Sequence, residues 1–153
     1  FYILAALAGI ALIIAIFMIV KWGRKSKSSP VIATNQTLKE LDSLKKKKYI
    51  EGGNFRAFYV ELIDISRDFI AKQYHLPADV LLTDDLIDVM KKNNTISQDN
   101  EKVIEDVFLR GDLVKFAKTF PDQQTMEKDF ADIKGFVKRS SKDLEFENLR
   151  KDV

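Results

Sequence analysis

The sequence predicts an all-α protein, in which a single N-terminal transmembrane helix precedes a small cytoplasmic bundle of about five or six helices. Three observations favour this architecture. The first twenty residues are apolar without interruption, later apolar residues recur every three or four positions, and no stretch alternates with a period of two for long enough to demand a strand. We therefore divide the chain into a transmembrane helix over 1–22, a basic flexible linker over 23–36, a helical domain over 37–139 and a charged tail over 140–153.

The opening segment, Phe1 to Val20, carries no charged side chain. As a helix it spans roughly 30 Å, the thickness of a bilayer's hydrocarbon core. A cleaved signal peptide fits less well, because no basic stretch precedes the apolar run and no small-x-small site follows it. A buried helix of a soluble protein would have to be apolar on every face in a chain too small to surround it. Since the sequence begins with Phe, we expect it to be part of a longer chain.

Small residues gather near one face of this segment, at Ala5, Ala8, Gly9 and Ala15. Such a face lets a second membrane helix approach closely. Alanine is also simply common in membrane helices, so a packing face and an ordinary composition both remain open.

Charge is distributed unevenly along the chain. The formal net charge is +2, yet 21–48 has nine Lys or Arg against two acids, whereas 49–153 has sixteen against twenty-one. A short basic flank after an apolar segment usually stays in the cytoplasm, which sets the orientation. The candidate ligands for anionic lipid headgroups are Lys21, Arg24, Lys25, Lys27, Lys45, Lys46, Lys47 and Lys48. A solvated lysine face is the competing interpretation, and nucleic acid is disfavoured because no aromatic residues are interleaved.

The linker and the first helix of the domain follow from local composition. The stretch 23–35 is rich in Ser and Lys and contains Pro30, which is typical of a solvated linker. Thr34, Asn35 or Thr37 is expected to cap a helix that ends before Gly52 and Gly53. Its apolar face has a leucine every third residue, at Leu38, Leu41 and Leu44.

The range 54–74 is the longest predicted helix of the domain. Its apolar side chains keep to one stripe opposite its charged ones, so we expect it to be the central helix of the core. His75 follows, before Leu76 and Pro77 stop the helix. It is the one histidine of the sequence and has no second ligand at i+4, so we interpret it as a helix-terminal residue and not as part of a metal site.

A helix over 83–93 is expected to begin with Thr83 as its cap. Asp84 and Asp85 fall in its first turn, where acids suit the positive end of the helix dipole. We interpret these acids as part of the helix start, and a hydrolase with an unrecognised acidic site as the less favoured alternative.

The remaining chain predicts three more helices. Ser97 caps the first, which Gly111 interrupts; a short helix over 112–118 follows, capped by Asp112; and the last covers 122–139. Packed together, these helices are expected to bury one core containing Phe58, Leu62, Phe69, Val107, Phe108, Phe116 and Phe130.

Three phrases of the sequence then suggest a family. N-F-R-A-F-Y-V-E-L, L-L-T-D-D-L and G-D-L-V-K-F-A-K, placed after a membrane helix and a basic linker, resemble the C-terminal part of BatD-like proteins and the short membrane proteins encoded beside them. The resemblance covers roughly 38–137 and matches recurring residues at Asp112, Lys115, Phe116 and Ala117. The sequence departs from full BatD proteins in lacking their large β-rich extracytoplasmic region.

The resemblance implies a context more than an activity. It suggests a bacterial inner-membrane protein encoded with MoxR-type AAA+ ATPases and with membrane proteins that carry von Willebrand factor A domains, in systems linked to aerotolerance or envelope stress. It lends no catalytic or cofactor-binding residues.

The residues themselves favour a binding protein over an enzyme. The sequence has no cysteine, glycine-rich phosphate loop, nucleophile elbow or metal-ligand spacing, and we expect no cofactor. We expect a non-catalytic membrane-anchored adaptor or scaffold that forms a hetero-oligomer with von Willebrand factor A membrane proteins and a MoxR-type ATPase, and that binds no nucleic acid. An anionic-lipid-binding module at the membrane surface is the alternative.

The predicted partner contact lies on a hairpin over 111–121. Lys115 and Lys118 on this hairpin, with Arg110 just before it, would present a positive patch to an acidic surface. A local ion pair between Lys115 and Asp112 is the competing interpretation.

Overall fold

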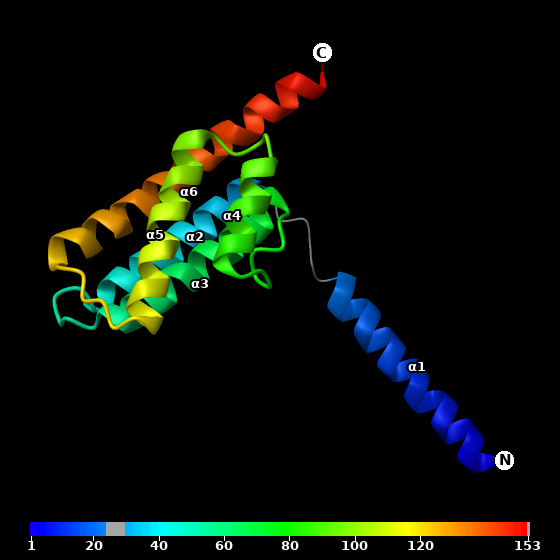
Figure 1. The fold of residues 1–153 in the computed structure, drawn as a ribbon. Helices are drawn as coiled ribbons and strands as arrows, with labels where there is room; N and C mark the ends of the chain where they lie inside the picture. Colours follow the sequence, from blue (N-terminus) through cyan, green and yellow to red (C-terminus); the bar gives the residue numbers. More distant parts are fainter. Residues whose placement is uncertain (24–29, 153) are drawn as a thin grey trace.

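The computed structural model describes residues 1–23 and 30–152; within them it leaves out the side chains of Leu4, residues 18–23, residues 30–32, Phe146 and Glu147. Its helices are α1 (Tyr2–Gly23), α2 (Pro30–Lys46), α3 (Phe55–Tyr74), α4 (Thr83–Lys92), α5 (Gln98–Phe116) and α6 (Gln123–Lys151) (Figure 1). No strand occurs in the described ranges, and the bundle has five helices, so the predicted all-α architecture is confirmed.

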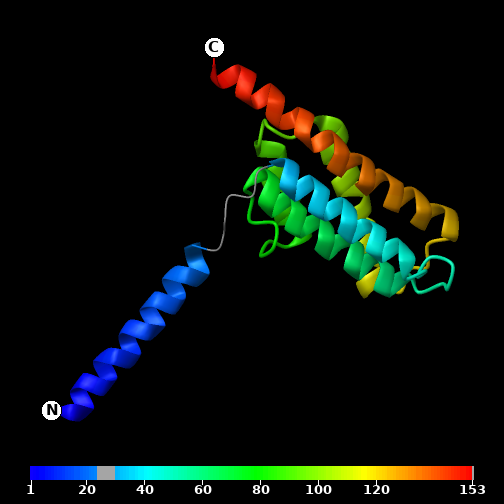
Figure 2. The ribbon, with the colours of Figure 1, turned by 180° about the vertical axis from the view of Figure 1, so that it is seen from behind.

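Helix α1 stands apart from the bundle in both views (Figures 1 and 2). It contacts none of the other described helices, and its large apolar side chains are exposed, from Ile3 at 77% to Phe17 at 67%. Among the described residues, no helix is both long enough and apolar enough to cross a membrane. The transmembrane assignment of this segment stays a prediction.

Helix α3 is the central helix of the core, as the sequence predicted: it contacts α2, α5 and α6, and nine of its twenty residues are buried. Six of the seven residues expected in the core are indeed buried: Phe58, Leu62, Phe69, Val107, Phe108 and Phe130. The seventh, Phe116, is 82% exposed, and its assignment to the core is wrong. The reason is the register of α5, whose inward face is set by Val107, Gly111 and Val114 and leaves Phe116 on the opposite side.

Gly111 does not interrupt α5 but lies buried within it. A Cβ atom at this position would lie 2.0 Å from Cδ1 of Ile63, so the glycine permits α5 to pass close to α3. The predicted short helix over 112–118 and the hairpin over 111–121 are therefore wrong, and Asp112 lies inside α5 instead of capping a helix. A glycine here costs about 1 kcal/mol of helix propensity, which the close packing offsets.

Adding a methyl group at Gly111 and at Gly135 is expected to have opposite effects. Gly111→Ala should lower the free energy of unfolding by about 1 to 2 kcal/mol, because overpacking against Ile63 outweighs the gain in helix propensity. Gly135→Ala, in α6, meets only the flexible end of Arg139 and should be neutral or stabilise by up to about 1 kcal/mol. Urea denaturation of both variants measures the difference, and equal effects would contradict the close approach of α5 and α3.

Two boundaries differ from the prediction. Helix α2 begins at Pro30, so the predicted linker over 23–36 is too long, and the buried Ala33 and Thr37 lie inside a helix. Proline suits a first helical position, because its missing N–H would have no partner there. Residues 24–29 of the predicted linker lie outside the described part.

Helix α6 continues to Lys151, beyond the predicted end at 139. The residues expected to begin a charged tail are helical, and Ser140 and Asp143 are buried. Asp143 accepts hydrogen bonds from the hydroxyl of Tyr74 at 2.7 Å and from Nδ2 of Asn100 at 2.7 Å. These partners from α3 and α5 hold the extended helix against the bundle.

Of the predicted helix caps, Ser97 is confirmed, whereas Thr34, Asn35 and Thr37 lie inside α2 and cap no helix. Ser97 accepts a hydrogen bond from the N–H of Asn100 at 3.3 Å, as a cap does. Helix α4 begins at Thr83, but Leu82 occupies the capping position and the Thr83 hydroxyl instead accepts from Arg67 at 3.0 Å. His75 ends α3 in a left-handed conformation (φ 56°) and is exposed, as expected for a helix-terminal residue.

Candidate interaction surface

A buried polar cluster holds α5 against α3 and α6. Asp129 is 1% exposed and accepts hydrogen bonds from the Tyr59 hydroxyl at 2.6 Å and from Nη1 of Arg110 at 2.5 Å. Burial, and then the bond to Asp129, raises the pKa of Tyr59. For Arg110, burial is the largest influence and opposes the charge, but the hydrogen bond to Asp129 and the attraction of nearby negative groups together outweigh it and raise the pKa. Arg110 is thus engaged inside the molecule, and its assignment to a free positive patch is wrong.

The other two predicted contact residues are placed near the end of α5. Lys115 is half-buried, whereas Lys118 is exposed and adopts a left-handed conformation (φ 50°) just after the helix. The carbonyl of Leu113 accepts the N–H of Ala117 at 2.9 Å and that of Thr119 at 3.4 Å, and these bonds close the end of the helix. In the described part of the chain neither lysine forms an ion pair, so the alternative pair of Lys115 with Asp112 is not formed.

The outward face of α5 carries an apolar stripe. Leu109, Leu113 and Phe116 are 39%, 52% and 82% exposed. Their spacing of four and three residues places them on one face of the helix, opposite the buried Gly111. We call these three residues the α5 stripe. Contiguous exposed apolar patches on a folded domain commonly mark an interaction site.

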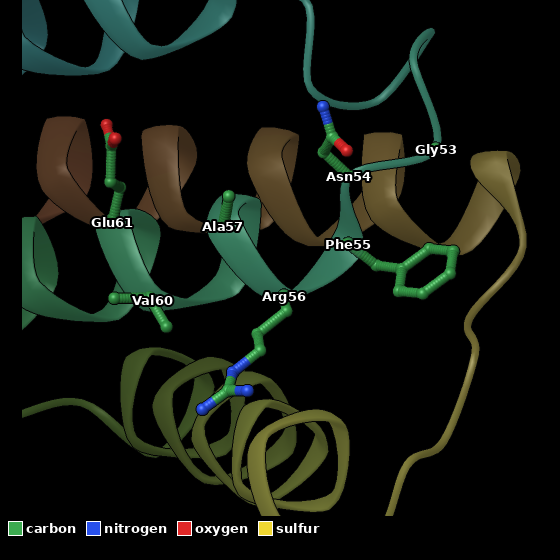
Figure 3. A pocket seen from close by; sticks show the side chains of 7 residues that line it. All are labelled: Gly53, Asn54, Phe55, Arg56, Ala57, Val60 and Glu61. Carbon is green, nitrogen blue, oxygen red and sulfur yellow. The ribbon is translucent and has the colours of Figure 1, made fainter.

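Two aromatic rings extend the apolar surface near the end of α5. Phe120 lies in the connection to α6, is 69% exposed and packs edge-on against Phe55 at 5.2 Å between ring centres. Phe55 belongs to the first turn of α3 and lines a shallow hollow there, with Gly53, Asn54, Arg56, Ala57, Val60 and Glu61 (Figure 3). The start of α3 and the chain after α5 therefore share one end of the bundle.

Arg56 adds a third cation at this end. Its guanidinium reaches from α3 toward α5 (Figure 3), it is exposed, and it forms no ion pair with another described residue. We call Arg56, Lys115 and Lys118 the basic rim. Sequence periodicity did not link Arg56 with the two lysines, because they are about sixty residues apart in the chain.

The lysine run Lys45 to Lys48 covers the end of α2 and the residues just after it. It lies at the same end of the bundle as the start of α3, because Lys47 pairs with Glu61. Helix α2 has seventeen residues, from Pro30 to Lys46, and is therefore about 25 Å long. Lys47 pairs with Glu61 at 2.8 Å, and this bond lowers the pKa of Glu61. Lys45 lies 5.8 Å from the ring centre of Phe130. The run is thus distant from the point where the chain joins the bundle.

The other candidate residues are exposed or lie outside the described part. Arg24, Lys25, Lys27 and the side chain of Lys21 are outside it, so lipid contact there stays a prediction. Among the small residues of α1, a Cβ atom added to Gly9 meets nothing within 4 Å. The packing face of Ala5, Ala8, Gly9 and Ala15 likewise stays a prediction. Asp84 and Asp85 are exposed in the first turn of α4.

Comparison of the chain with protein-family models, with curated proteins and with solved structures finds no match. Within the described ranges, no three acidic or histidine side chains gather in an arrangement that would hold a metal ion. The functional assignment therefore starts from the geometry of α1 and of the surface around the α5 stripe.

Proposed function

We propose that the chain is a non-catalytic, membrane-tethered adaptor: α1 inserts into the bilayer, and the bundle of α2 to α6 presents a surface for a protein partner. The observation that carries this proposal is the exposure of α1. The large apolar side chains that are described in α1 are at least 53% exposed, and no other described helix packs on it. Burying one such side chain is favourable by about 1.5 to 3 kcal/mol, so lipid is a far better solvent for α1 than water.

The order of the elements also supports a tether. The uncharged stretch Phe1 to Val20 is as long as a hydrocarbon core is thick, and Lys21 and Trp22 follow at the position where basic and aromatic residues meet headgroups. Six residues, 24–29, lie between the end of α1 and the start of α2 at Pro30. In this proposal the domain lies on the cytoplasmic side of a bacterial inner membrane, close to the bilayer at Pro30 and facing away from it at Lys46.

The finer proposal concerns the partners. The resemblance to BatD-like proteins supports a place beside a MoxR-type AAA+ ATPase and membrane proteins with von Willebrand factor A domains. Of the residues that carry this resemblance, Phe116 is 82% exposed and Lys115 has no ion pair in the described part. An exposed aromatic beside a cation suits a protein contact better than a purely structural role.

Arginine placed in the middle of α1 is expected to release the chain from membranes. We expect the unaltered chain to stay in the membrane pellet after alkaline carbonate extraction. Ile10→Arg with Ile14→Arg should move it to the supernatant, because each arginine at the centre of a spanning helix costs about 2.5 to 3.5 kcal/mol.

A matched control places the same side chains on the bundle. Val80 and Leu82 are each 76% exposed in the loop before α4, so Val80→Arg with Leu82→Arg should leave the chain in the pellet. Extraction of the unaltered chain by carbonate, or retention of the α1 variant, would refute the tether.

A further inference from the structure

We propose that the α5 stripe and the basic rim together bind an acidic amphipathic helix of a partner protein. This inference rests on the proposed adaptor function and names the surface and the chemistry of its partner. It commits to one kind of occupant: an α-helix with an apolar face flanked by Asp or Glu side chains.

The stripe has the geometry of one half of a helix–helix contact. Leu109, Leu113 and Phe116 follow one another at four and three residues, the spacing with which apolar side chains of two packed helices interdigitate. Phe116 is by far the most exposed of the three and is an aromatic of the kind that anchors interfaces. Their common face is turned away from α3, since Gly111 on the opposite side touches Ile63.

The charges around the end of the stripe favour an acidic partner. Arg56, Lys115 and Lys118 form no ion pairs in the described part of the chain. Two acids of this region interact with other groups: Asp112 lies close enough to Arg67 to favour its charge, and Asp122 accepts the N–H of Thr125 at 2.7 Å. The three cations are thus unpaired in the described part of the chain, and carboxylates beside an apolar helix face would complement them.

Its position favours a protein over a lipid surface. Helix α2 leads away from Pro30 over about 25 Å, and α3 begins at the far end. Phe55 of α3 touches Phe120, which places the end of α5 there as well. In the proposed adaptor this surface therefore lies at the end of the bundle remote from the tether at Pro30, where a protein partner can reach it.

Two synthetic peptides of equal length test the inference. Both carry leucines on one helical face, flanked by Glu in one peptide and by Lys in the other, and their binding to the full chain in phosphatidylcholine nanodiscs is followed by fluorescence anisotropy. We expect the acidic peptide to bind at least about tenfold more tightly than the basic one, with an affinity that falls as salt is added. Phe116→Ser should weaken the acidic peptide by about tenfold or more, as loss of an aromatic anchor does.

Two further variants distinguish charge complementarity from non-specific hydrophobic binding. Lys115→Glu with Lys118→Glu should reverse the preference between the peptides, while circular dichroism stays unchanged because neither lysine forms an ion pair in the described part of the chain. Leu149→Ser, at the equally solvent-facing end of α6 (64% exposed), should leave binding as it was. Equal binding of both peptides, or equal losses in Phe116→Ser and Leu149→Ser, would overturn the inference.

The remaining outcomes are also decisive. If neither peptide binds but the chain does adhere to phosphatidylserine vesicles through Lys115 and Lys118, the surface is a lipid contact and the proposal is wrong. Failure of the tether is distinguishable, since it appears in carbonate extraction of the α1 variant. In that case the same peptide titration is carried out on the chain in solution.

Discussion

Phe69→Ala is expected to lower the free energy of unfolding of the bundle by about 3 to 5 kcal/mol. Phe69 is fully buried in the second half of α3, and its ring packs edge-on against Phe136 of α6 at 5.6 Å between centres. Truncation removes this contact and leaves a cavity between two helices that cannot close without moving the whole of α6. Urea denaturation followed by circular dichroism measures the change.

The matched control is the same substitution at an exposed ring. Phe120 also makes an edge-on contact, with Phe55, but it is 69% exposed, so Phe120→Ala should cost less than about 1 kcal/mol. If Phe69→Ala unfolds like the unaltered chain, or if the two variants are equally destabilised, α3 is not the centre of the core.

Periodicity was sufficient for the parts of the fold that depend on local chemistry. The apolar stripe of 54–74 identified the central helix, and Ser97 was found as a cap because a short polar side chain before an apolar run has few other roles. Periodicity was insufficient where a residue distant in the sequence determines the local structure. Gly111 is a helix breaker by propensity, yet its contact with Ile63, forty-eight residues earlier, makes it part of α5.

The same limitation explains the end of α6. Ser140 and Asp143 belong to a stretch that is polar in sequence, and only their partners from other helices account for their burial. Ser140 accepts from Nε2 of Gln73 at 3.1 Å, and Asp143 from Tyr74 and Asn100. When the partners of a polar residue are more than forty positions away in the chain, its neighbours in the sequence predict that it lies on the surface.

The candidate surface was predicted in part. Lys115 and Lys118 were identified from their spacing, but Phe116 was assigned to the core, which hid the α5 stripe. One continuous helix over 98–116 would have revealed it: once Val107, Gly111 and Val114 face inward, Leu109 and Phe116 have no room there. Arg110 was misassigned because its partner, Asp129, belongs to the following helix.

Arg110→Leu is expected to be the most damaging change to a charged residue of the bundle, lowering the free energy of unfolding by about 3 kcal/mol. It leaves the carboxylate of Asp129, which is 1% exposed, with the Tyr59 hydroxyl as its remaining partner. Breaking a buried pair usually costs about 3 to 5 kcal/mol, and we expect the lower end because the Arg110 side chain is 35% exposed. Urea denaturation at neutral pH measures it.

The double variant Arg110→Leu with Asp129→Asn identifies the cause of that loss. An asparagine can still accept the Tyr59 hydroxyl and carries no charge, so most of the stability should return, to within about 1 kcal/mol of the unaltered chain. A double variant as unstable as Arg110→Leu would mean that the arginine acts through packing of its aliphatic stem and not through its ion pair. Because neither residue belongs to the α5 stripe or the basic rim, the double variant should also bind the acidic peptide normally, whereas an Arg110 that contacts the partner directly would weaken binding even when the fold is restored.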